Sequence, residues 1–145
     1  TSSSDEKLVR AKIMGAWQTI NYKANPDWEK TVLDMTGGLG VDHVVEVGGA
    51  GTVERSVEAV RVGGTIGMIG VLTQGTLNAT AVMRKSIRLQ GIYVGSRCMF
   101  ENMNKAITAH EMRPVVDRTF PLEEACAAFH YMDKAGHFGK IVITV

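Results

Sequence analysis

The stretch VVEVGGAGTVERSVEAVRVGGTIGMIGVL, residues 44–72, places two glycine clusters between two apolar runs. Glycines that follow a strand and begin a helix often bind phosphate through backbone N–H groups. Here Gly49 and Gly51 fill the first two positions of a G-x-G-x-x-G motif, but the third position holds Glu54. A carboxylate there would repel a pyrophosphate, and the chain contains no G-x-x-x-x-G-K either. The stretch predicts a strand, turn, helix and strand without a phosphate loop.

The same turn has two possible meanings. Gly48 and Gly49 could let a ligand touch the backbone, because glycine has no side chain to block it. The alternative is a tight strand-to-helix turn without a ligand, and the glycines alone leave both open. Gly48, Gly70 and Gly95 all fall at the predicted carboxyl ends of strands, where ligands bind in doubly wound sheets. We therefore expect any site to lie at that edge of the sheet.

Helices and strands are expected to alternate along the chain. Hydrophobic periodicity and turn residues predict helices at residues 4–15, 25–38, 52–61 and 97–112, and strands at 18–22, 41–47, 64–72 and 87–94. After Pro114, a separate tail contains the segment 115–120, a helix at 121–136 and a strand at 140–145. Strands that alternate with helices indicate βαβ crossovers and a doubly wound parallel α/β sheet.

Composition limits the classes of function. The 145 residues are 45% hydrophobic and 21% charged, with a net charge of +1, as in a soluble globular domain. The charge does not suggest a nucleic-acid partner, and the apolar runs of about eight residues are too short for a membrane span. The first residues do not resemble a signal peptide, and Cys98 and Cys126 fit reduced thiols. We expect a cytoplasmic protein.

Two kinds of catalytic site find little support. Cys126 and His130 lie four residues apart on a predicted helix, but two ligands do not make a zinc site. No serine occupies a G-x-S-x-G nucleophile elbow. We therefore assign no metal ligand and no catalytic residue. The segment TSSSDEK is more suggestive, because its three serines, Lys7 and the later Tyr22 could bind a phosphomonoester; the alternative is a helix cap with a solvated lysine.

With these elements in order, the chain closely resembles the cofactor-binding part of medium-chain dehydrogenases and reductases, the zinc-type alcohol dehydrogenases and quinone oxidoreductases. The resemblance rests on SSSDEKLVRAKIMGAWQTINY, TGGLGVDHVVEVGGAGTVERSVEAVRVGGTIGMIGVL, IRLQGIYVGSR and HFGKIVITV. It implies a partial Rossmann-like doubly wound parallel sheet that lacks its first strands and the G-x-G-x-x-G loop. Residues 1–113 would form a truncated nucleotide-binding domain, and residues 114–145 a segment that returns to the catalytic domain.

The resemblance also implies which residues would form one wall of the cofactor-binding site. Ser2 resembles the position that carries a ribose-binding acid in NAD-preferring members, and a serine there favours NADP while leaving NAD possible. The positions that would hold the ribose 2′-phosphate are Ser3, Ser4, Lys7 and Tyr22. The positions that would flank the adenosine and ribose are Val47, Gly48 and Gly49. The positions that would line the nicotinamide are Gly70, Val71, Leu72, Ile92, Tyr93 and Val94.

The family's reaction is hydride transfer between nicotinamide and an alcohol, aldehyde, quinone or enone. Any zinc would belong to a catalytic domain outside this chain, so we expect the chain alone to be inactive and to bind NADPH weakly or not at all. The absent strands would leave a gap of roughly 14 Å, closed by rearranged pairing, chain exchange or dimerisation. A homodimer through strand 87–94 is expected. The alternatives are a methyltransferase-like domain that binds S-adenosylmethionine and a non-catalytic Rossmann module.

Overall fold

The computed structural model describes all 145 residues. Its helices are α1 (Asp5–Ile13), α2 (Trp28–Met35), α3 (Ala50–Ala59), α4 (Ala79–Arg84), α5 (Arg97–Ala109) and α6 (Ala125–Asp133), with a 3-10 turn, η1, at Leu122–Glu124. Its strands are β1 (Val41–Glu46), β2 (Val60–Met68), β3 (Arg88–Gly91), β4 (Val116–Pro121) and β5 (Lys140–Thr144). Two compact units emerge, Thr1–Val94 and Gly95–Val145, each described separately below.

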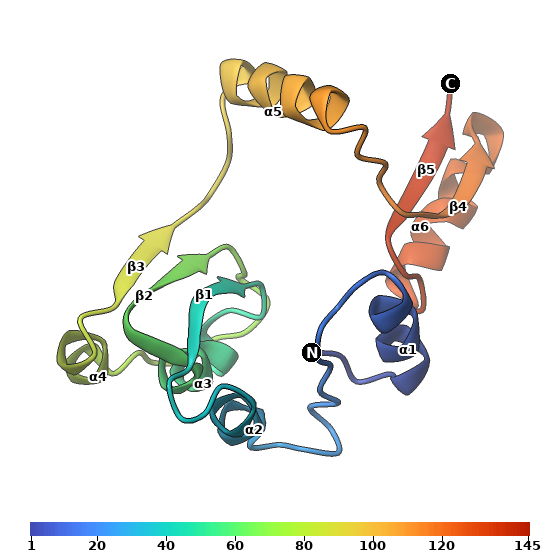
Figure 1. Cartoon of the computed structure of the whole chain (residues 1–145). Helices are drawn as coiled ribbons and strands as arrows, with labels where there is room; N and C mark the ends of the chain where they lie inside the picture. The colour runs from blue at the N-terminus through green and yellow to red at the C-terminus, as the bar shows by residue number, and fades with distance from the viewer. The chain divides into compact units, whose positions relative to one another are not determined.

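The first unit contains a three-stranded parallel sheet in the order β1-β2-β3 (Figure 1). β2 occupies the centre, and its Met68 pairs with Glu46 of β1 on one side and Gly91 of β3 on the other. Helix α3 connects β1 to β2 and α4 precedes β3, so both connections are the helical crossovers that parallel strands require. This arrangement confirms the expected strand, helix and strand from β1 to β2 and adds a helix before β3.

The core of this unit lies where α3 meets the sheet. Val57, Val60, Ile66 and Ile87 form its buried cluster. Val53 and Val57 are almost fully buried because their spacing of four residues places them on one face of α3. The Lys85 ammonium donates to the backbone carbonyls of Val57 and Glu58, each at 2.8 Å, and so satisfies two carbonyls at the C-terminal end of α3.

The strand expected at residues 18–22 is wrong. The segment makes only an isolated parallel bridge between Asn21 and Ser2, with Ser2 N–H donating to Ile20 and Tyr22 N–H donating to Ser2, each at 3.1 Å. β1 pairs only with β2 and is an edge strand, and Val45 on it is 71% exposed. β1 lies where a strand was expected at 41–47, but nothing in the chain pairs with its open edge, so rearranged pairing within one chain is wrong; chain exchange and dimerisation stay predictions.

Other elements differ at their ends. Helix α4 was not expected; its cap, the Asn78 side chain, accepts from the Ala81 N–H at 3.2 Å. β3 ends at Gly91 rather than residue 94, so Gly95 is not at a strand end. The predicted cap of α1 is confirmed, since the Ser4 hydroxyl accepts from the Lys7 N–H at 3.3 Å. None of the helices has the length and apolar character needed to cross a membrane.

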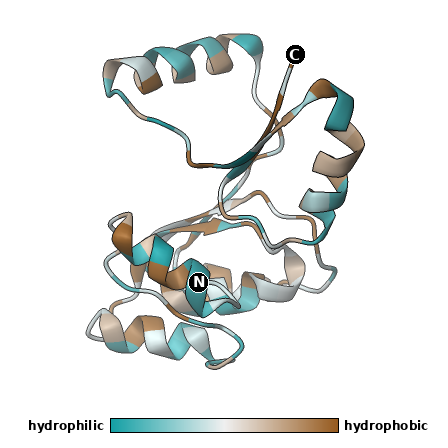
Figure 2. Ribbon diagram, turned by 90° about the vertical axis from the view of Figure 1, so that its right-hand side faces the viewer, coloured by the Kyte–Doolittle hydropathy of each residue, from teal (hydrophilic) through white to brown (hydrophobic).

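The second unit, Gly95–Val145, has its own small sheet, in which β4 and β5 pair in parallel. Helix α6 connects the two strands along the chain. Phe120 is buried and lies beside Tyr131, whose hydroxyl donates to Asp117 at 2.8 Å. Helix α5 carries alternating hydrophobic and hydrophilic stretches (Figure 2) and has no buried residue. The predicted tail thus contains the expected helix and strand, and its residues 116–121 form a strand as well.

Candidate functional site

The carboxyl ends of β1, β2 and β3 lie in one row, because Glu46, Met68 and Gly91 are paired in register. Beyond that row, the backbone N–H groups of Ile69 and Gly70 both donate to the Glu46 carbonyl at 2.9 Å. The Ile92 N–H donates to the Met68 carbonyl at 2.8 Å. The segments 47–49, 70–72 and 92–94 therefore leave the sheet at the same edge, as expected for the carboxyl ends of parallel strands.

Two glycines allow the loops after β1 and β2 to touch. A Cβ atom on Gly70 would lie 2.1 Å from the Val47 carbonyl oxygen and 2.8 Å from the Gly48 nitrogen. A Cβ atom on Gly49 would lie 3.1 Å from the Gly70 carbonyl oxygen, and Gly49 also has a φ of +93°, which favours glycine. These glycines are required for the close approach of the two loops, whatever binds there.

The turn after β1 is held by a buried carboxylate. Glu46 Oε1 accepts from the Gly48 N–H at 2.8 Å, the Gly49 N–H at 3.1 Å and the Thr52 hydroxyl at 2.6 Å. Oε2 accepts from the Ser56 hydroxyl. Burial by itself would raise the pKa of Glu46. The four hydrogen bonds together lower this pKa by more than burial raises it, so the pKa lies below its ordinary value. Glu46 is thus ionised at neutral pH and fixes both glycine amides.

Thr73 links the turn to the loop that follows β2. Its hydroxyl donates to the Gly48 carbonyl at 2.9 Å and accepts from the Gly51 N–H at 2.8 Å. Gly49 and Thr73 also form an isolated parallel bridge. The loop beyond Gly70 is consequently held to the first turn of α3, with the exposed side chains of Val71 and Leu72 lying between these anchors along the chain.

A cavity of about 560 Å³ lies along the open edge of β1. We call it the β1 cavity. It brings together four of the predicted site residues, Tyr22, Val47, Gly48 and Leu72, with Thr1 and Trp28. Its surface is largely apolar, which suits the planar rings of a ligand more than a cluster of charges.

The predicted phosphate-binding residues occupy the start of the chain. Ser4 caps α1 and accepts from the Lys7 N–H, while the Ser2 hydroxyl accepts from the Ser4 N–H at 3.2 Å. Ser3 is exposed and Lys7 half-buried. None of Ser2, Ser3, Ser4 and Lys7 lines the β1 cavity, whereas Tyr22, which is joined to Ser2 by a backbone hydrogen bond, does. These residues therefore adjoin the cavity through Thr1, which precedes Ser2 in the chain, and through Tyr22.

The residues predicted to line the nicotinamide are exposed. Val71, Leu72, Tyr93 and Val94 each have more than 75% of their surface accessible, an unusual density of large apolar side chains for two short loops. Ile92 is less exposed, and its Cδ1 atom lies 3.2 Å from where a Cβ on Gly67 would stand. Gly67 in the middle of β2 thus makes room for Ile92.

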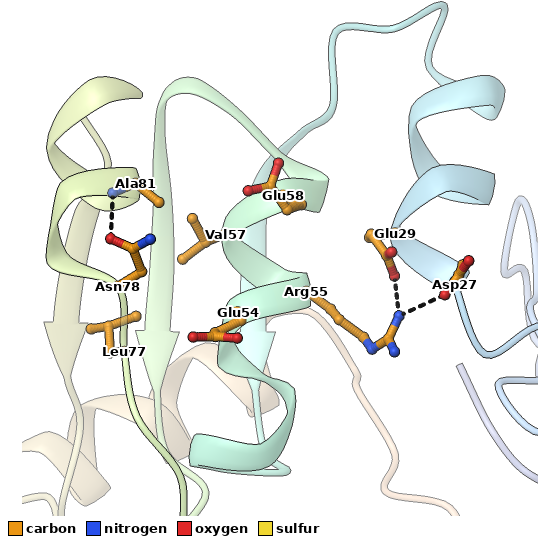
Figure 3. Close-up of a pocket in the computed structure, with 9 residues that line it drawn as sticks. All are labelled: Asp27, Glu29, Glu54, Arg55, Val57, Glu58, Leu77, Asn78 and Ala81. Atoms are coloured by element: carbon orange, nitrogen blue, oxygen red, sulfur yellow. Dashed lines mark hydrogen bonds and ion pairs between the residues drawn. The ribbon is translucent and has the colours of Figure 1, made fainter.

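A second cavity, of about 450 Å³, lies between α2, α3 and α4 (Figure 3). Its walls carry the carboxylates of Asp27, Glu29, Glu54 and Glu58 and one guanidinium, that of Arg55. Arg55 already bonds Glu29 at 2.8 Å and Asp27 at 3.2 Å. The remaining negative charge would repel the phosphates of a dinucleotide, so we do not place a cofactor there.

Sequence reasoning missed Glu46 and Thr73. The signal for Glu46 was a lone acid at the end of an otherwise apolar run, followed by hydroxyl residues at positions 52 and 56 that α3 turns toward it. Thr73 gave no recognisable signal, because its partners are 22 and 25 residues away in the sequence. No group of three or more His, Cys, Asp or Glu side chains is placed to hold a metal ion, so no step is assigned to zinc here.

Comparison with known proteins identifies the family. Residues 1–109 match the family described as zinc-binding dehydrogenase, and the chain belongs to that family. Over its full length it is 42% identical to a zinc-type alcohol dehydrogenase-like protein of Schizosaccharomyces pombe and covers 44% of that protein. It is 31% identical to a 2-haloacrylate reductase of a Burkholderia species, with 99% of the chain and 46% of the relative covered.

Solved structures agree with this assignment. A putative alcohol dehydrogenase from Sinorhizobium meliloti shares 36% identity and a TM-score of 0.90, with 99% of this chain and 42% of that chain covered. An NAD-dependent alcohol dehydrogenase gives 33% identity and a TM-score of 0.85, over 98% and 42%. The expected partial Rossmann-like fold is confirmed, and the chain spans less than half of the length of these relatives. The family match favours an oxidoreductase over the methyltransferase-like alternative.

Proposed function

We propose that this chain forms one wall of a nicotinamide dinucleotide site in an oxidoreductase. The observation that carries the proposal is the contact between the loops after β1 and β2, where Gly70 leaves no room for a Cβ atom and a Cβ on Gly49 would be crowded. Such a contact places backbone groups and apolar side chains of two strands at the edge where α/β sheets bind ligands. The β1 cavity beside it is large enough to enclose part of a dinucleotide.

In this proposal each segment has a role. Val47, Gly48 and Gly49 flank the adenosine and ribose, and the exposed apolar residues 71–72 and 92–94, with Gly70, line the nicotinamide. The start of the chain favours NADP, because its hydroxyls and an ammonium suit a 2′-phosphate. Position 2 is a serine, so no acid there repels the phosphate. The residues that would hold the phosphate are Ser2, Ser3, Ser4, Lys7 and Tyr22.

The reaction proposed for the whole protein is hydride transfer between the nicotinamide and a small alcohol, aldehyde, quinone or enone. Two relatives support this breadth, since one is named as alcohol dehydrogenase-like and another as a 2-haloacrylate reductase. The dinucleotide supplies the hydride chemistry when bound, and residues of this chain bind and orient it. A homodimer, a cytoplasmic location and the assignment of residues 114–145 to a catalytic domain stay predictions.

An NMR titration of the ¹⁵N-labelled chain with NADPH and NADH tests the proposal. Of the two outcomes expected from the sequence, weak binding or none, the proposal requires weak binding, with a Kd of about 1 mM for NADPH, or about −4 kcal/mol, because the chain offers only one wall. Shifts should be confined to residues 47–49, 70–72 and 92–94, and NADPH should also shift residues 2–7. The absence of shifts with either dinucleotide at ten times that concentration would contradict the proposal. Micromolar affinity would contradict the claim that this chain supplies only one side of the site.

A further inference from the structure

Glu46 is the residue on which both loops of the candidate site converge. Its backbone carbonyl accepts the N–H groups of Ile69 and Gly70, the first residues after β2. Its carboxylate accepts the N–H groups of Gly48 and Gly49 and two hydroxyls of α3. One residue thus fixes the turn after β1 from the side chain and the loop after β2 from the main chain.

The buried arrangement favours an ionised carboxylate over a neutral group. Glu46 is 4% exposed, yet each of its oxygens has a donor. A neutral glutamine has one carbonyl oxygen, so its amide group could no longer accept from Ser56 and would have to donate to that hydroxyl, while the Gly48 and Gly49 amides would face a neutral acceptor. Hydrogen bonds to an ionised acceptor are also stronger than those to a neutral one.

We infer that Glu46 is a positioning residue, whose carboxylate sets the direction of the Gly48 and Gly49 amides and so the shape of the dinucleotide wall. This inference rests on the proposed function. Glu46 acts through the turn, which touches the cofactor, and so affects affinity beyond any effect on folding.

The carboxylate also makes the turn unfavourable for a direct anion contact. Both glycine N–H groups point at Glu46, so neither is free to bind a phosphate. The Gly48 carbonyl accepts from Thr73 and the Gly49 carbonyl from the Thr52 and Val53 N–H groups, so the turn presents its Cα surface toward the ribose. This explains physically why glycines that resemble part of a phosphate loop do not form one here.

The test uses the ¹⁵N-labelled chain, with Glu46→Gln as the variant and Glu54→Gln as the control. Glu54 is an exposed acid on α3, so its change removes the same charge without touching the turn. In Glu46→Gln we expect amide exchange at Gly48 and Gly49 to accelerate about tenfold, with exchange at Ile66 in β2 unchanged. The Kd for NADPH should rise about tenfold under conditions where both proteins are fully folded.

A purely structural role would lower the melting temperature and leave the Kd of the folded protein unchanged, and this outcome overturns the inference. If the wild-type chain binds neither dinucleotide, the proposed function fails instead, and unchanged exchange at Gly48 and Gly49 would still overturn the role of Glu46. Should Glu46→Gln not fold, Ser56→Ala removes only the bond to Oε2. It should accelerate the same exchange about two- to threefold, and no change would contradict the inference.

Discussion

Replacing Gly70 with alanine should separate the two loops of the candidate site. The added Cβ would lie 2.1 Å and 2.2 Å from the carbonyl oxygen and carbon of Val47, which are backbone atoms that no side-chain rotation can move. Restoring van der Waals separation requires a displacement of roughly 1 Å or more. Gly70 does not have a positive φ, so the cost is purely steric.

The magnitude follows from two contributions. Forcing an extra carbon into a close contact costs about 1–3 kcal/mol. The displacement also strains the hydrogen bonds from Ile69 and Gly70 to the Glu46 carbonyl, each with a net value of about 0.5–1.5 kcal/mol. We therefore expect Gly70→Ala to lower the free energy of unfolding by about 2–4 kcal/mol.

Urea unfolding monitored by circular dichroism measures this change. Gly91→Ala is the matched control, because Gly91 lies in the same sheet and a Cβ there meets nothing within 4 Å. The control should stay within about 0.5 kcal/mol of the wild type. A Gly70→Ala variant as stable as the control would show that the loops do not approach as closely as described, and would remove the observation that carries the proposed function.

Two further predictions concern the Glu46 carboxylate and the C-terminal end of α3. Because the pKa of Glu46 is lower in the folded chain than its ordinary value of 4.5, its stabilising contribution is complete above that value and is lost as the pH falls through the folded pKa. Unfolding free energies measured between about pH 6 and 3 should therefore fall less steeply in Glu46→Gln, and parallel curves would contradict this. Lys85→Met removes the donor to the Val57 and Glu58 carbonyls and should cost about 1 kcal/mol by urea unfolding; an unchanged midpoint would show that water replaces the ammonium.

Much of the fold was accessible from the sequence because the signals were local. The helix cap at Ser4, the β-branched run at 41–46 and the valines of α3 each act within a few residues, and the structure has α1, β1 and α3 at these places. The failure of the phosphate-loop motif at Glu54 was equally visible. The expected parallel sheet then predicted that the segments after β1 and β2 would meet at the edge formed by the carboxyl ends of the strands.

Features that depend on contacts between residues far apart in the sequence were determined only by the tertiary structure. Whether residues 18–22 form a strand depends on a neighbour to pair with, and only Ser2 is available. The exposure of β1 follows from the same lack of a second neighbour. The roles of Glu46 and Thr73 depend on α3 and the loop after β2 folding back onto the turn. Sequence thus determined most of the elements and the edge where a site could lie, while side-chain hydrogen bonds across the fold determined that the glycine turn is held by a carboxylate.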